Sequence, residues 1–356
     1  MSHPTIVNGG YWLSNTAGKL PASNIDATLY THLFCGYAEI NATSHEVTIP
    51  STEVSHFSEK VKMSNPNVKT LLSITGDSKV FSDIAKVPTA RDTFIKSSIK
   101  AAVNSGFDGL DLQWLYPSSP TDMQNFETLI GKWRQAVVDD ARTYNRAARI
   151  LVASVPNLPY IEKNVEYPGE AIKQNLDWVN LVCYDFYTPA EGSSAGNTGP
   201  SSALFNRNNG SLSACFGIES WTKYVPATKI VFGIPFHGWA WQLADPPEYD
   251  VFSKASGPAA SDVGYVIGTD GQMEYSEVKK FIGANACKGK NIPNDPRFGI
   301  AYAYANATWI AYESESTIPV KIELAKQNQL LGYFAWNISG DDDVNTLYNA
   351  AKTNWH

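Results

Sequence analysis

The chain has 356 residues, of which 43% are apolar and 18% charged, and its formal net charge at pH 7 is −7. This composition is typical of a globular protein and excludes a disordered tail or a membrane-embedded protein. The acidic balance and the lack of a Lys/Arg run give no electrostatic footprint for nucleic acid or an anionic membrane, so neither is expected as a partner.

Eight short apolar runs recur along the chain, each followed by a helix-like or loop stretch. They are almost continuously apolar rather than alternating, which is typical of strands buried on both faces of a parallel sheet. The runs are Thr5–Leu13, His32–Ile40, Lys69–Gly76, Gly109–Tyr116, Arg149–Pro156, Trp178–Tyr187, Lys229–Gly238 and Leu330–Ile338.

Amphipathic stretches between these runs predict helices. In the stretch Thr121–Asn145, for example, one helix face carries Phe126, Ile130, Trp133 and Val137. Eight strands alternating with helices predict the α/β class and a (β/α)8 TIM barrel. A doubly wound open sheet is the alternative, which the missing Gly-rich turn after the first strand disfavours. The amphipathic stretches that predict helices are Thr52–Met63, Ala90–Asn104, Thr121–Asn145, Tyr160–Asn175 and Thr317–Gln329.

One connection is too long for a barrel loop. Residues 241–311 contain a Pro/Gly-rich stretch, a helix-like Glu274–Ile282 and two aromatic runs. They predict a small α+β insertion after strand seven. We therefore expect one domain over residues 1–356, with the barrel in 1–240 and 312–356.

The fourth strand carries the polar residues of most interest. Barrel enzymes act at the C-terminal ends of their strands. Asp111, Gln113 and Leu115 alternate there and share one strand face, while Asp108 precedes them and is expected to fix the turn into the strand. An Asp inside a barrel is costly unless it is hydrogen-bonded, so its presence is a functional hint.

The run from Phe107 to Pro117 resembles the DGxDxDWEYP signature of glycoside hydrolase family 18, the chitinase family. Further segments in the same order along nearly the whole chain resemble plant class V chitinases. They are Gly10-Tyr11-Trp12, Thr31-His32-Leu33-Phe34-Cys35, Leu71-Leu72-Ser73-Ile74, Tyr184-Asp185-Phe186-Tyr187, Pro235-Phe236-His237-Gly238, Thr308-Trp309-Ile310-Ala311-Tyr312 and Gly332-Tyr333-Phe334-Ala335-Trp336.

The departures from that signature decide the expected function. The resemblance implies that the last signature Glu is the general acid and that the preceding Asp orients the substrate's N-acetyl group; here these positions hold Leu115 and Gln113. Leu donates no proton, and general-acid catalysis alone is worth roughly 10²–10⁴-fold. Strand three departs as well, with Ser73 to Gly76 where the family usually has a Gly pair. We therefore expect no chitinase activity and no catalytic residue, with the signature reduced to the degenerate motif Asp108, Asp111, Gln113 and Leu115.

The resemblance also implies which residues would bind sugar. Trp336 corresponds to the floor of the innermost subsite, and Tyr184 and Asp185 correspond to residues that contact the sugar there. Asp111 is expected to remain as a buried, hydrogen-bonded relic. The complete expected carbohydrate-binding set is Tyr11, Phe34, Trp114, Tyr184, Asp185, Tyr187 and Trp336.

The favoured hypothesis is a lectin that binds chitin-type oligosaccharides, N-glycans or glycoproteins. Agglutination would require more than one site, hence at least a homodimer. The alternatives are an inhibitor of microbial glycosidases, a storage protein, or a new enzyme for a small apolar metabolite using Asp77, Asp185 or His237.

No metal or cofactor is expected, because the four cysteines form neither a CxxC pair nor a Cys/His cluster. The resemblance implies a secreted or vacuolar protein. Residues 1–10 do not resemble a leader, so a cytoplasmic location stays open.

Overall fold

The computed structural model describes residues 6–162, 165–190, 196–207, 210–244, 248–285, 292–295 and 297–355, with side chains not described at 292–295. The chain divides into two compact units. The first comprises Met1–Val182, Glu219–Phe232 and Gln329–Phe334; the second comprises Cys183–Ile218, Gly233–Asn328 and Ala335–His356. Within the described ranges, no helix combines the length and apolar character needed to cross a membrane.

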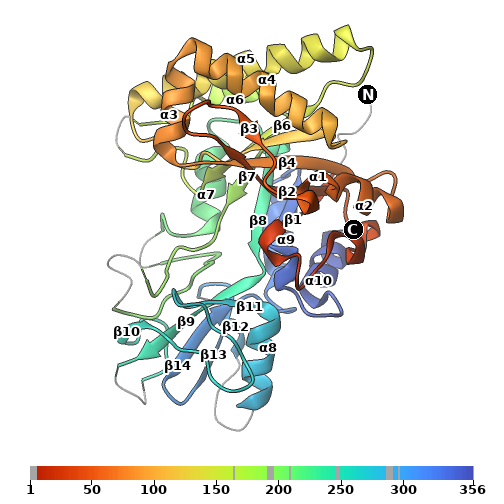
Figure 1. Cartoon of the computed structure of the whole chain (residues 1–356). Helices are drawn as coiled ribbons and strands as arrows, with labels where there is room; N and C mark the ends of the chain where they lie inside the picture. Colours follow the sequence, from red (N-terminus) through yellow and green to blue (C-terminus); the bar gives the residue numbers. More distant parts are fainter. Residues whose placement is uncertain are drawn as a thin grey trace. The chain divides into compact units, whose positions relative to one another are not determined.

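Eight strands form the closed barrel that the sequence predicts, in the order β1-β15-β8-β7-β6-β5-β4-β2, with β1 also pairing with β2. Figure 1 labels β1, β2, β4, β6, β7 and β8 among them. Val7 N donates to Leu331 O at 3.2 Å and Leu331 N donates to Ile230 O at 2.9 Å, which closes the ring. The short strand β3 (Val47–Thr48) is added antiparallel to β2. The barrel strands are β1 (Val7–Leu13), β2 (His32–Ile40), β4 (Lys69–Thr75), β5 (Gly109–Leu112), β6 (Ile150–Pro156), β7 (Trp178–Val182), β8 (Ile230–Pro235) and β15 (Gly332–Trp336).

Helix α5 (Pro120–Thr143) shows why the local sequence folds as it does. The Ser119 hydroxyl accepts from Asp122 N at 3.0 Å and caps the helix, and Pro occupies its first turn. Its apolar face is buried as the spacing predicts. The other helices are α1 (Thr52–Ser55), α2 (Phe57–Ser64), α3 (Ser78–Lys86), α4 (Pro88–Asn104), α6 (Gly169–Asn175), α7 (Ala214–Trp221), α8 (Tyr275–Ala284), α9 (Ile318–Gln327) and α10 (Thr346–Trp355).

Several predicted elements end earlier or begin later than expected. Strand β5 stops at Leu112 rather than Tyr116, and β7 stops at Val182 rather than Tyr187. The helix predicted from Tyr160 begins only at Gly169. Pro168 explains the last difference, because a proline disfavours helical geometry in the residue before it.

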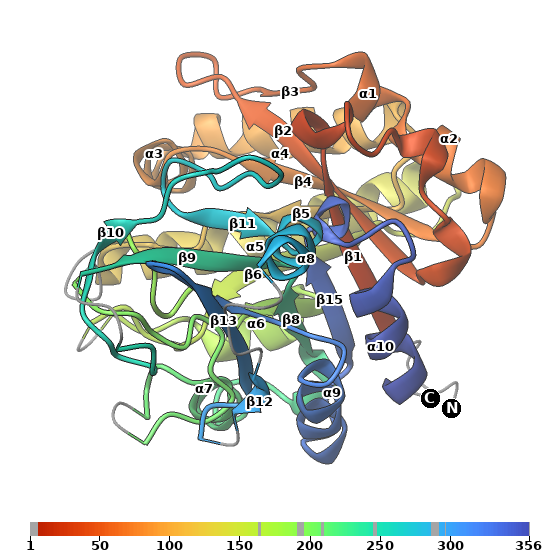
Figure 2. The ribbon, with the colours of Figure 1, turned by 90° about the horizontal axis from the view of Figure 1, so that it is seen from below.

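The second unit contains a six-stranded sheet in the order β10-β9-β14-β13-β12, with β11 also paired to β9. Helix α8 packs on β9, β11 and β14, as Figure 2 shows from below. This sheet and helix form the predicted α+β insertion, although its first strand begins at residue 237 rather than 241. The strands are β9 (His237–Leu243), β10 (Ala255–Pro258), β11 (Gln272–Glu274), β12 (Ile292–Asp295), β13 (Ile300–Ala305) and β14 (Thr308–Tyr312).

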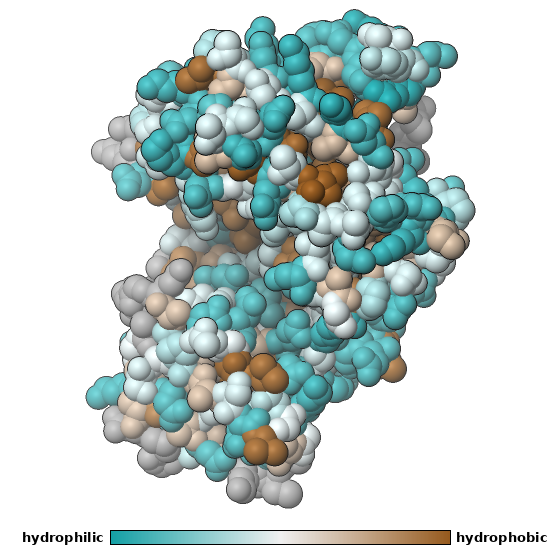
Figure 3. All heavy atoms as spheres, viewed as in Figure 1, coloured by the Kyte–Doolittle hydropathy of each residue, from teal (hydrophilic) through white to brown (hydrophobic). Residues whose placement is uncertain are grey.

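Aromatic side chains dominate the core of this second sheet. The Trp241 and Trp309 rings meet edge to face at 5.4 Å, and Tyr302 stacks on Trp309 at 5.2 Å. Hydrophilic side chains predominate on the face drawn in Figure 3, where apolar ones lie in small groups. Trp241, Tyr302 and Trp309 thus pack against one another in the core of the second sheet.

Candidate functional site

A buried polar network lies inside the barrel, entirely within the first unit. Its centre is Asp111, which is fully buried on β5. One carboxylate oxygen, Oδ2, accepts hydrogen bonds from Ser73 Oγ at 2.7 Å, Tyr11 OH at 2.9 Å and Gln113 Nε2 at 2.6 Å. The other oxygen, Oδ1, has no hydrogen-bond partner among the described residues.

The donors of this network are themselves held by neighbouring strands. Gln113 Nε2 also donates to Ser154 Oγ at 2.8 Å, and Asn180 Nδ2 donates to Tyr11 OH at 2.7 Å. Burial raises the pKa of Asp111 to about 6, although the hydrogen bonds from Ser73, Tyr11 and Gln113 act in the opposite direction. The structure thus brings Asp111 and Gln113 together as the strand alternation predicts.

Leu115 lies beyond the end of β5 and is half-buried. Its backbone carbonyl accepts a hydrogen bond from Tyr167 OH at 2.5 Å. The anchored carbonyl fixes the chain at this position, while the isobutyl side chain offers neither a proton nor a charge. No acid–base chemistry is therefore available from residue 115.

Asp108, just before β5, is bonded to the neighbouring strand β4 and to Lys62. Its Oδ2 accepts from Thr70 N at 2.9 Å and lies 2.8 Å from Lys62 Nζ. Burial acts to raise the pKa of Asp108, but the bonds from Lys62 and Thr70 outweigh it and the pKa is lowered. Asp108 therefore joins the beginnings of β4 and β5.

Three aromatic members of the predicted sugar-binding set are buried in the first unit. The Tyr11 and Phe34 rings stack at 4.5 Å, and neither is exposed. Trp114 is 1% exposed and stacks on Phe81 of α3 at 5.6 Å. These three rings are buried against other side chains, so they could affect sugar binding only through the shape of the barrel interior.

A second polar cluster lies in the second unit, beyond the end of β7. Asp185 Oδ1 accepts from His237 Nε2 at 2.8 Å and from Trp239 Nε1 at 2.7 Å. Asp185 has a left-handed backbone with φ of 60°. The Tyr184 ring meets the His237 ring edge to face at 5.9 Å. This cluster presents an exposed carboxylate whose orientation is fixed by two donors.

Trp336 and Tyr187 are also in the second unit, and each is partly buried. Trp336 ends β15, and its carbonyl accepts from Phe236 N at 2.6 Å. Tyr187 packs against Phe252 at 5.6 Å, and its hydroxyl accepts from Asn206 Nδ2 at 3.2 Å. Tyr187 is thus fixed beside the aromatic core of the second sheet.

Sequence reasoning overlooked most of the residues that orient these side chains. Ser154, Asn180 and Trp239 were not singled out, and His237 was considered only as an acid or base for a new enzyme. The available signal was a polar residue within an apolar strand, where an unpaired polar group is costly. Cys287, one of the four cysteines, lies outside the described residues.

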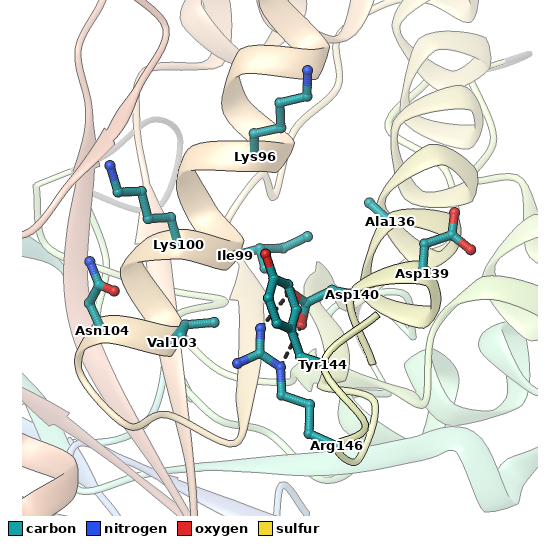
Figure 4. Close-up of a pocket in the computed structure, with 10 residues that line it drawn as sticks. All are labelled: Lys96, Ile99, Lys100, Val103, Asn104, Ala136, Asp139, Asp140, Tyr144 and Arg146. Carbon is teal, nitrogen blue, oxygen red and sulfur yellow. Dashed lines mark hydrogen bonds and ion pairs between the residues drawn. The ribbon is translucent and has the colours of Figure 1, made fainter. Parts of the chain in front are cut away.

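A surface pocket of about 630 Å³ lies between α4 and α5 of the first unit (Figure 4). Arg146 pairs there with Asp140 at 2.5 Å and lies over the Tyr144 ring at 4.9 Å. Ile99 and Val103 point toward α5, as Figure 4 shows. The pocket includes the last turns of both helices, so it lies toward the N-terminal ends of the strands, where barrel enzymes do not place their chemistry.

Comparison with known proteins identifies close similarity over the full chain. The family model described as glycosyl hydrolases family 18 matches residues 8–341. A class V chitinase of Arabidopsis thaliana is 39% identical over 363 residues, covering 99% of this chain and 90% of that protein.

Solved structures agree with this result. A mutant class V chitinase from Nicotiana tobaccum, in complex with NAG4, is 37% identical with a TM-score of 0.90, covering 98% of this chain and 99% of that one. The chitinase-like agglutinin RobpsCRA from Robinia pseudoacacia is 35% identical with a TM-score of 0.86, covering 98% and 100%.

Proposed function

We propose that this chain, which belongs to glycosyl hydrolase family 18, is a lectin that binds oligosaccharides without hydrolysing them. The observation that carries the proposal is the pair Gln113 and Leu115 beside the buried Asp111. Among these three residues only Asp111 ionises, and it is fully buried.

Hydrolysis by the family mechanism needs a proton donor for the glycosidic oxygen and a carboxylate for the substrate's acetamide. Leu115 supplies no proton at any pH, and Gln113 carries no negative charge. The Gln113 amide is instead bonded to Asp111 and Ser154. Removing a general acid costs roughly 10²–10⁴-fold in rate, and removing the electrostatic partner adds a further loss.

Binding does not need those two groups. Trp336 is partly buried and offers an aromatic ring of the kind that stacks on sugars. The oriented carboxylate of Asp185 can accept hydrogen bonds from hydroxyl groups. Two relatives support the proposal, one described with NAG4 and one as an agglutinin.

The test is a glycan array carrying both chitin oligomers and high-mannose N-glycans. We expect wild-type binding that Trp336→Ala abolishes and Trp336→Phe partly keeps, because Phe retains a ring. Tyr144→Ala, which removes an exposed aromatic side chain from the surface pocket, is the matched control and should bind normally. Thermal unfolding of each variant separates loss of the site from loss of the fold.

A blank array for folded wild-type protein would refute the lectin proposal and turn attention to protein partners. If binding is found, agglutination of cells, inhibited by free glycan, would test the further proposal of at least a homodimer. We also propose a secreted or vacuolar location, which microscopy of the tagged full chain would test.

A further inference from the structure

His237 begins β9 and is the residue that connects the features of the second polar cluster. Its ring is 7% exposed and meets Tyr184 and Trp239 edge to face, each at 5.9 Å. This packing leaves the ring no freedom to turn toward solvent. Its two nitrogens must therefore be satisfied by the groups already around it.

Two of those groups are hydrogen-bond acceptors, a carboxylate and a backbone carbonyl. Asp185 Oδ1 lies 2.8 Å from Nε2, and the backbone of Trp336 also forms a hydrogen bond with His237. A neutral imidazole has one N–H donor, whereas the imidazolium has two. Only the protonated ring can therefore donate to both acceptors.

The surrounding charges favour the same state. Asp270 adds negative potential, and Glu274 on β11 lies opposite His237 in the strand register. Tyr184 is a further titratable group in contact with the ring. Burial lowers the pKa of His237, but Asp185, the Trp336 backbone and Asp270 outweigh it, so the pKa is raised above its ordinary value.

We propose that His237 in its imidazolium form is a positioning residue, which ties the Asp185 carboxylate to the backbone at Trp336 and so keeps both in place for an oligosaccharide. This inference rests on the proposed function and concerns the same site. His237 and Trp239 both bind Oδ1 of Asp185. The second carboxylate oxygen, Oδ2, has no hydrogen bond within the described residues and is left to accept from a sugar hydroxyl.

The sign of the pH dependence follows from the raised pKa of His237. Its charge is fully present below the ordinary histidine pKa of about 6.5 and is lost as the pH rises through the higher folded-state value. Oligosaccharide affinity should therefore be highest where His237 is charged and fall as the pH rises through its raised folded-state pKa.

The first experiment needs no ligand. Nitrogen-15 NMR of the histidine rings reports which nitrogens are protonated, and His237→Gln identifies the His237 signals by their disappearance. We expect both ring nitrogens of His237 to carry protons at pH 6.5. Asp185→Asn should lower the pKa of His237, because the Asp185 carboxylate is the largest influence that raises it. A ring that is neutral at pH 6.5, or a pKa that Asp185→Asn leaves unchanged, would overturn the inference.

The second experiment measures affinity for chitotetraose, or for the glycan selected by the array, from pH 6 to pH 9. We expect His237→Gln to lose roughly ten- to hundredfold in affinity at pH 6, since a charged hydrogen bond is replaced by at most a neutral one. The remaining binding should no longer vary with pH. His56→Gln, at an exposed histidine of the first unit, is the matched control and should behave as wild type.

The two proposals fail separately. Absence of glycan binding together with a doubly protonated His237 would refute the lectin function but leave the charge state of His237 established. Glycan binding that His237→Gln leaves unchanged in strength and pH dependence would refute the positioning role while the lectin function stands.

Discussion

Asp111 shows how a single residue can keep its structural environment when its chemical partners have changed. Three donors converge on one of its oxygens, and the side chain is fully buried. Burial raises its pKa to about 6, above the unfolded value near 3.9. Asp111 therefore stabilises the fold fully below that unfolded value, and this contribution is lost as the pH rises through about 6.

Replacing Asp111 with Asn should remove this pH dependence, because the amide does not ionise and its oxygen can still accept hydrogen bonds. The quantity to compare is the free energy of unfolding of Asp111→Asn minus that of wild type. This difference should be more positive at pH 7 than at pH 4 by on the order of 2 kcal/mol. Urea unfolding at both values measures this shift, with exposed Asp92→Asn as the control for the substitution. A relative stability that is identical at the two values would contradict the prediction.

Introducing carboxylates at positions 113 and 115 tests the proposal that Gln113 and Leu115 prevent hydrolysis. The double variant Gln113→Asp, Leu115→Glu supplies a charged partner for the acetamide and a proton donor, each worth roughly 10²-fold or more. We expect it to release shorter products from chitotetraose and the wild type to release none. Gln113→Asn with Leu115→Gln is the matched uncharged control. Equal, undetectable activity in both double variants would show that other changes also prevent catalysis.

The sequence predicts the roles of single residues only where local spacing determines them. The proximity of Asp111 and Gln113 follows from strand alternation. The bond of Asp108 to Thr70 of β4 joins residues 38 positions apart, and local spacing does not indicate it. The bond of His237 to Asp185 joins residues 52 positions apart, so no local pattern indicates it. The predicted binding set stays a prediction; burial of Trp114 and Phe34 depends on side chains of other elements that sequence spacing does not reveal.

At the scale of elements, α9 and β14 are joined by a buried ion pair. Lys321 Nζ lies 3.1 Å from Glu313 Oε1, and the two side chains are 1% and 0% exposed. Lys321 also bonds to the Ser202 carbonyl, and Thr317 Oγ1 donates to Glu313 Oε2 at 2.7 Å. Each charge is thus neutralised and hydrogen-bonded, which is the condition under which a buried ion pair is tolerated.

Breaking this pair should be far more costly than breaking one at the surface. Lys321→Met leaves Glu313 buried without its counter-charge and should lower the free energy of unfolding by about 3–5 kcal/mol. Lys79→Met is the control, because its pair with Asp83 is 84% and 51% exposed and should cost less than about 1 kcal/mol. Similar losses in both variants, measured by chemical denaturation, would contradict this account.

Elements with strong periodicity were predicted well, and those defined by tertiary contacts were not. The apolar face of α5 and the eight apolar strand runs were sufficient to predict the barrel. Helices α3, α7 and α10 were missed. Length does not account for this difference, because α8 and α9, with ten residues each, were predicted.

At the scale of the whole molecule, the fold and the family are established, and the proposed function depends on separating binding from catalysis. The prediction of one domain over residues 1–356 stays a prediction, and the chain divides into two compact units. One holds the buried network around Asp111, and the other holds Asp185, His237 and Trp336.

Native mass spectrometry of the wild-type protein with chitotetraose tests the central claim most directly, because one spectrum reports both the complex and any products. We predict a complex that retains the intact tetrasaccharide after prolonged incubation, with no shorter oligomers in solution. Accumulation of shorter oligomers in proportion to protein concentration would show that the chain is a chitinase and would contradict the account.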